Sequence, residues 1–154
     1  MIKNTYLRGL SLVLTMAFVT MSYAQDEAGV KATVNRLFDG MRKSDTAMIR
    51  SAFAPQGVLH TVVKTKDGKV LVRSEEIENF IQSIAKPRTE VLDERIEFES
   101  IKIDGDLASV WTPYQFYFGS NFSHCGVNSF QLVKMDGTWK IQYLIDTRRK
   151  QPCN

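Results

Sequence analysis

The chain has 154 residues, with 20 lysines and arginines against 17 aspartates and glutamates, so its formal net charge at pH 7 is +3. A nucleic-acid-binding protein is expected to gather basic residues on one face, and only Arg148, Arg149 and Lys150 cluster here. No nucleic-acid partner is therefore predicted. The length suits a single domain that can bury a core without a structural metal.

The first 24 residues have the pattern of a secretory signal peptide. Two basic residues precede an uncharged apolar run over residues 10–21, and small residues that a signal peptidase accepts end at Ala24. The run is shorter than the roughly 20 apolar residues that a membrane span needs. We therefore predict cleavage of residues 1–24, a periplasmic or secreted location, one domain over residues 25–154, and no membrane partner after cleavage.

The first half of the mature chain predicts three helices and a hairpin. Apolar residues recur at helical spacing in each helical segment, so one face of each helix is expected to be buried. A residue suited to cap a helix precedes the second and third segments, Ser44 or Asp45 in one case and Ser74 in the other. The predicted elements are a helix over residues 28–43, a short helix before Pro55, strands over 58–63 and 69–72 that flank Asp67-Gly68, and a helix before Pro87.

The second half predicts only strands, over residues 89–103, 107–118, 122–134 and 138–147. Turn residues separate these runs, which indicates a meander of long antiparallel strands and an α+β fold. In the first run the apolar residues change parity, which indicates a bulge near Glu99 that bends the strand.

A two-residue turn at Asp136-Gly137 would fix the register of the last hairpin. If no bulge intervenes, Leu132 pairs with Ile141, Phe130 with Tyr143, Asn128 with Ile145, and Cys125 with Arg148. The apolar face would then be the inner one, with Phe130, Leu132, Trp139, Ile141, Tyr143 and Ile145. Asp146 and Arg148 would form an ion pair on the outer face or at a subunit contact.

His124 and Asn128 share the inward parity of Phe130, so two polar side chains are expected at the end of an apolar wall. Either neighbouring groups satisfy them, or they orient a ligand in a cavity. Glu94 is either an exposed carboxylate at a strand end or a cavity residue whose pKa burial would raise. The face of His60 is not assigned. The candidate ligand-binding residues are His124, Asn128, Tyr143, Trp111, Tyr114, Phe130, Glu94 and His60.

No motif in the chain is specific for one reaction. A glycine-rich phosphate loop and a paired-cysteine metal motif are absent from the sequence, and its two histidines lie far apart. No cofactor and no metal site is therefore predicted. Because an exported chain can oxidise its thiols, Cys125 and Cys153 are expected to form a disulfide rather than a thiol nucleophile.

Four segments resemble exported bacterial members of the nuclear transport factor 2-like superfamily, which includes SnoaL-like proteins, in the group labelled putative lumazine-binding. They are residues 103–114, 122–133, 136–141 and 146–149. The resemblance implies an α+β cone, in which a strongly bent, mainly antiparallel sheet wraps three helices, with a cavity at the open end. It also implies a homodimer through the outer sheet face. The catalytic residues of enzymes in this superfamily do not match this chain by motif, so none is carried over.

Two functional hypotheses follow. In the first, the protein is a periplasmic or secreted small-molecule-binding protein with an apolar, aromatic-rimmed pocket. In the second, it is a cofactor-independent isomerase, dehydratase or cyclase, in which His124 transfers a proton and Asn128 or a pocket tyrosine polarises a carbonyl. A structural dimer module with a filled interior is a third alternative.

Overall fold

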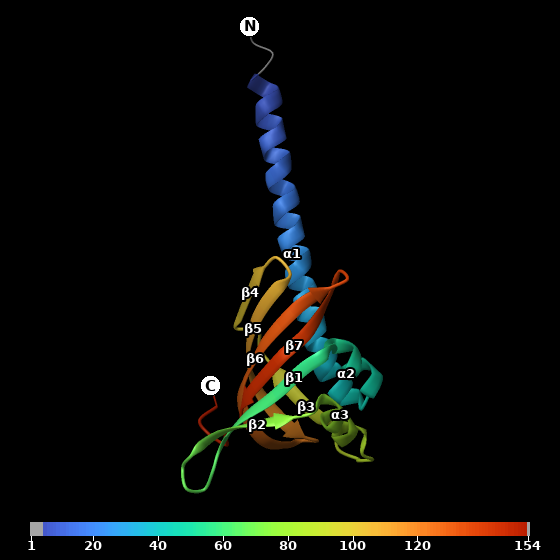
Figure 1. The fold of residues 1–154 in the computed structure, drawn as a ribbon, viewed down its shortest axis with the longest axis vertical. Coiled ribbons are helices and arrows are strands. Elements are labelled where there is room, and N and C mark those ends of the chain that lie inside the picture. The colour runs from blue at the N-terminus through green and yellow to red at the C-terminus, as the bar shows by residue number, and fades with distance from the viewer. Residues whose placement is uncertain (1–4, 154) are drawn as a thin grey trace.

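The computed structural model describes residues 5–153, with side chains from Ala24 onward. Three helices pack against one face of a seven-stranded sheet (Figure 1). The predicted α+β class is thereby confirmed. The helices are α1 (Thr5–Lys43), α2 (Thr46–Ala52) and α3 (Ile77–Ala85), and the strands are β1 (Phe53–Lys64), β2 (Val70–Glu75), β3 (Leu92–Ile96), β4 (Ser100–Asp104), β5 (Leu107–Phe118), β6 (Asn121–Met135) and β7 (Thr138–Thr147).

The sheet has the strand order β2-β1-β7-β6-β5-β3, and β4 also pairs with β5. Only the β1–β7 contact is parallel. β3 and β4 lie along successive halves of β5, and the ladder is interrupted between them at residues 97–99. The bulge predicted near Glu99 is therefore confirmed as a break that bends the sheet around the helices.

The first helix is longer than the sequence pattern predicts, because it begins at Thr5 and not near Ala28. Its N-terminal half projects beyond the rest of the molecule, whereas its C-terminal half lies on the sheet (Figure 1). Residues 1–4 of the predicted signal peptide lie outside the described residues. No helix in the described part of the chain is long and apolar enough to cross a membrane.

The two predicted helix caps have different outcomes. Asp45 caps α2, since its Oδ1 accepts a hydrogen bond from the backbone N–H of Met48 at 2.8 Å. The prediction that Ser74 caps α3 is wrong, because β2 continues to Glu75 and Ser74 pairs with His60 of β1. The segment around Ser74, which the sequence predicts as the start of a helix, is therefore the end of a strand that is hydrogen-bonded to β1.

The core lies between the helices and the inner face of the sheet, the face toward α1. Phe130 of β6 is fully buried there, and its ring meets that of Phe38 from α1 edge to face with centroids 6.2 Å apart. Ile49 and Ile81 bring α2 and α3 into the same core. Such a core holds the helices against the strands that carry the candidate site.

The register of the last hairpin changes at a bulge in β7. Asp136 and Gly137 both have positive φ, 48° and 74°, and Leu132 pairs with Ile141 as predicted. Beyond that pair, β7 contains one extra residue. The observed pairs are Gln131 with Tyr143, Phe130 with Leu144, Asn128 with Asp146, and Cys125 with Arg149.

This bulge makes the predicted pairs beyond Leu132–Ile141 wrong by one residue. An extra residue in one strand reverses the parity of every side chain that follows it. Tyr143 and Ile145 therefore point to the outer face, whereas Leu144 and Asp146 are buried on the inner face. The prediction that Asp146 and Arg148 lie outside the sheet is wrong for the same reason, although their ion pair is confirmed at 2.7 Å.

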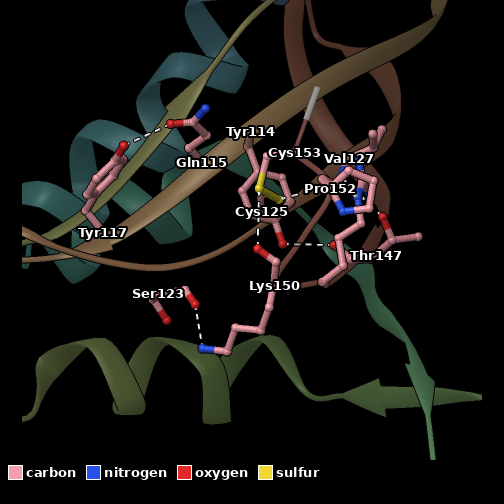
Figure 2. Close-up of a disulfide and its surroundings, with 11 residues drawn as sticks. Tyr114, Gln115, Tyr117, Ser123, Cys125, Val127, Thr147, Lys150, Pro152 and Cys153 are labelled. Carbon is pink, nitrogen blue, oxygen red and sulfur yellow. Dashed lines mark hydrogen bonds between the residues drawn. A yellow bond between two sulfur atoms is a disulfide. The ribbon is translucent and has the colours of Figure 1, made fainter.

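A disulfide ties the C-terminal segment to β6 (Figure 2). The predicted bond between Cys125 and Cys153 is confirmed. Arg149 exchanges two backbone hydrogen bonds with Cys125, and Lys150 donates from Nζ to the Ser123 carbonyl at 2.6 Å. The segment that follows β7 is thus fixed on both sides of Arg149, which also fixes the backbone position of Arg148.

Candidate functional site

A cavity of about 210 Å³ opens between the helices and the inner face of the sheet. Most of its wall is apolar, and five of its polar residues come from β3, β6 and the C-terminal end of β7. The apolar lining residues are Leu37, Phe38, Met41, Leu59, Phe80, Ile84, Leu92, Phe116 and Leu144, and the polar ones are Glu75, Ser83, Glu94, His124, Asn128, Asp146 and Arg148.

Glu94 of β3 and Asn128 of β6 are joined at the polar end of the cavity. Asn128 donates from Nδ2 to Oε1 of Glu94 at 2.8 Å. Burial raises the pKa of Glu94 to about 7, an effect that the nearby charge of Asp146 increases and the hydrogen bond from Asn128 opposes. The Glu94 carboxyl can therefore change its protonation state near neutral pH.

Asp146 forms the centre of a hydrogen-bonded cluster behind this pair. Its Oδ1 accepts from Thr61 Oγ1 at 2.6 Å, and its Oδ2 accepts from Arg148 Nε at 2.7 Å. The Tyr114 hydroxyl lies 3.4 Å from Oδ2 and donates to the Thr147 carbonyl at 2.9 Å. Burial, together with the charges of Glu94 and Asp146, raises the pKa of Tyr114, so this tyrosine stays protonated. The cluster fixes the side chains at the inner end of β7.

His124 lies at the other side of the polar end, between two aromatic rings. Its ring centroid is 5.0 Å from that of Phe116 and 5.8 Å from that of Tyr114. Nδ1 lies 3.0 Å from the Ser123 hydroxyl. Partial burial and the positive charge of Arg148 lower the pKa of His124. A neutral imidazole at pH 7 can accept a proton, so His124 has the protonation state of a general base.

The structure brings together three of the eight predicted ligand-binding residues along the cavity, namely His124, Asn128 and Glu94. Two others lie behind the lining. Tyr114 is buried against Asp146, and Phe130 is part of the core. These five residues form the end wall of the cavity and its support.

Three predicted residues lie on the outer face and do not line this cavity. The bulge in β7 turns Tyr143 outward, where its hydroxyl lies 3.1 Å from Nδ1 of His60. His60 alternates with the buried Leu59 and Thr61 along β1, which places it on the outer face as well. Trp111 has the outward parity of β5 and is 45% exposed.

Sequence reasoning missed Asp146 and Arg148 as cavity residues. Both depend on the bulge, and the sequence contains no turn residue or glycine that would reveal it. Among the residues that the structure describes, no group of histidines, cysteines or carboxylates is arranged to hold a metal ion. The polar end can form hydrogen bonds, and Glu94 and His124 are the groups there that can transfer protons.

Residues 25–143 match the sequence model of a family described as "Putative lumazine-binding". No curated protein matches the chain.

Solved structures share the fold. A nuclear transport factor 2-like protein of unknown function from Shewanella baltica is 20% identical, with a TM-score of 0.64, over 84% of this chain and 98% of that one. A nuclear transport factor 2-like protein with a cystatin-like fold from Novosphingobium aromaticivorans is 9% identical, with a TM-score of 0.72, over 90% and 92% of the two chains. At such identities the likeness shows the fold alone, and it confirms the predicted nuclear transport factor 2-like fold.

Proposed function

Because this chain belongs to the family described as "Putative lumazine-binding", we propose that it binds a small organic molecule in the cavity beneath the inner face of the sheet. The observation that carries this proposal is a cavity with apolar walls and a few polar groups at one end. This combination is typical of small-molecule sites, in which apolar walls supply affinity and polar groups fix orientation.

The size of the cavity favours a small ligand. Its volume of about 210 Å³ is below the roughly 300–1,000 Å³ of pockets that hold drug-sized molecules. A ligand with one ring or two fused rings would fit a cavity of this volume. Lumazine, a fused two-ring heterocycle, is the first probe to test because the family description names it.

Binding of lumazine can be followed by its fluorescence in a titration with the mature protein. We expect Ser83→Trp to weaken binding at least about tenfold, since Ser83 lines the cavity and an indole there would fill it. Gln82→Trp is the matched control, because Gln82 is exposed on the same helix and does not line the cavity. Equal loss in both variants, or no loss in Ser83→Trp, would contradict a site in this cavity.

A second candidate function is proton-transfer catalysis as an isomerase, dehydratase or cyclase. It is favoured by two titratable groups at one end of the cavity whose pKa values move in opposite directions, upward for Glu94 and downward for His124. For any ligand found to be converted, His124→Gln should abolish turnover with little change in melting temperature. Unchanged turnover would reject His124 as the catalytic residue.

Export is part of the proposed function. The signal-peptide pattern of residues 1–24 and the disulfide both suit an oxidising compartment. When the full chain is expressed in a Gram-negative bacterial host, we expect the periplasmic fraction to contain a protein of 130 residues that begins at Gln25. Intact mass and N-terminal sequencing check this result. A full-length cytoplasmic product would contradict it.

We also propose a homodimer through the outer face of the sheet. Trp111 is 45% exposed there, and Val72 on the same side of the sheet is 57% exposed. A charge in an apolar interface would be left without a partner, so Trp111→Arg is expected to convert a dimer into a monomer in analytical ultracentrifugation. Val91→Arg, at an exposed site outside the sheet, is the control. A monomeric wild-type protein would refute the dimer.

A further inference from the structure

We infer that the cavity selects ligands that carry a lactam, an N–H and a C=O on one ring edge, because Glu94 and Asn128 offer the complementary groups side by side. This inference rests on the proposed function and adds the class of ligand.

Three of the polar residues that line the cavity, Ser83, Asp146 and Arg148, are already bonded to other protein groups. Asp146 accepts from Thr61 at 2.6 Å and from Arg148 at 2.7 Å. Ser83 donates from its hydroxyl to the Phe80 carbonyl at 2.7 Å. A ligand that used these groups would have to break or share an existing bond. These groups therefore contribute to the shape of the cavity more than to hydrogen bonding with a ligand.

Glu94 and Asn128 keep unfilled capacity. The bond between them uses one N–H of the Asn128 amide and one oxygen of the Glu94 carboxyl. Within residues 24–153, no other side-chain hydrogen bond involves the carboxyl of Glu94 or the amide of Asn128. The second carboxyl oxygen, the amide oxygen and one amide N–H are left for a ligand, and both residues line the cavity.

A lactam matches this set of groups. A protonated Glu94 carboxyl can donate from its free oxygen to the lactam C=O. The lactam N–H can donate to the other carboxyl oxygen or to the amide oxygen of Asn128. A carboxylate ligand would instead bring a second negative charge next to Asp146, whose ion pair already engages Nε of Arg148. The geometry thus favours a neutral ring with a lactam edge over an organic acid.

The charges around Glu94 set its protonation. Burial has the largest effect and raises the pKa of Glu94 to about 7. The negative charge of Asp146 also raises this pKa, whereas the positive charges of Arg148 and Arg42 lower it. A ligand that needs the protonated carboxyl should bind less tightly as pH rises through 7. The titratable and charged groups that face or adjoin Glu94 are Arg42 from α1, Glu75 from β2, Asp93 and Arg95 from β3, Tyr114 from β5, His124 from β6, Asp146 from β7, and Arg148 just after β7.

The test compares three probes that share two fused rings, 2-quinolone, 1-methyl-2-quinolone and quinoline, by calorimetric titration of the mature protein. Only 2-quinolone has a free lactam edge. We expect it to bind at least about tenfold more tightly than either of the others at pH 6, since each good hydrogen bond contributes about 1 kcal/mol or more. Its affinity should fall by about tenfold between pH 6 and pH 8.

Two variants locate the effect. Glu94→Leu should remove the preference for 2-quinolone over quinoline, whereas Glu97→Leu, on an exposed residue near the same strand, should keep it. Glu94→Gln should make the affinity for 2-quinolone equal at pH 6 and pH 8, and this test stands even if Glu94→Leu does not fold. Equal affinity of all three probes, with binding still blocked by Ser83→Trp, would overturn the lactam inference and leave the proposed function intact.

Discussion

Gly126→Ala is expected to destabilise the protein by about 3 kcal/mol or more and to remove ligand binding. A Cβ atom at this position would lie 1.8 Å from the Thr147 carbonyl oxygen and 2.8 Å from Cε1 of Tyr114. Because both neighbours belong to the support of Asp146, relief of the clash must move β7 or the tyrosine ring. Overpacking in a core costs about 1 to 3 kcal/mol, and a backbone clash costs more than a clash with a flexible side chain.

Urea unfolding of the variant measures this loss of stability. Ser129→Ala is the control, since Ser129 lies on the same strand, faces the other side of the sheet and is expected to change stability by no more than about 0.5 kcal/mol. If Gly126→Ala is as stable as the wild type, β7 can shift at little cost. The end wall of the cavity would then not be rigid.

Glu94→Gln is expected to stabilise the ligand-free protein at pH 8 and to have little effect at pH 4.5. The pKa of Glu94 rises from 4.5 to about 7 on folding. Between these pH values the folded protein keeps a proton that the unfolded chain has lost, so the contribution of Glu94 to stability falls as pH rises. Above pH 7 the buried carboxyl must ionise, which costs up to about 3 kcal/mol.

The measurement is the free energy of unfolding of wild type and variant at several pH values between 4.5 and 8. The difference between them should grow with pH and level off above 7. Glu97→Gln, which removes an exposed carboxylate near the same strand, is the control variant. A constant difference for Glu94→Gln would show that Glu94 ionises like an exposed carboxylate.

Much of the fold can be predicted from local patterns. The turn residues Asp67-Gly68 and Asp136-Gly137 lie where strands reverse, and Asp45 begins a helix, because each of these signals acts within a few residues. The break between β3 and β4 is also visible as a change of apolar parity. Predictions of this kind succeed when the signal and its effect are close together in the chain.

The inner end of β7 could not be predicted in the same way. Tyr143 and Ile145 are apolar, and so is Leu144, so hydrophobic alternation fits the register with the bulge as well as the one without it. The contact between Thr61 and Asp146 joins residues 85 positions apart through the parallel β1–β7 pair. The predicted inward parity of Asn128 is confirmed, because it depends on β6 alone. Its hydrogen bond to Glu94 could not be predicted, because that contact depends on how the folded sheet places β3 relative to β6.

The disulfide has a practical consequence for the preparation of the protein. Cys125 and Cys153 hold the residues that follow β7 on the outside of β6, while Arg148 reaches Asp146 from the same segment. Material produced in a reducing cytoplasm would lack this covalent tie, and the backbone of Arg148 would lose one of the restraints on its position. Affinities measured on such a sample would be lower than those of the oxidised protein, so the redox state of the sample has to be verified before any ligand is declared inactive.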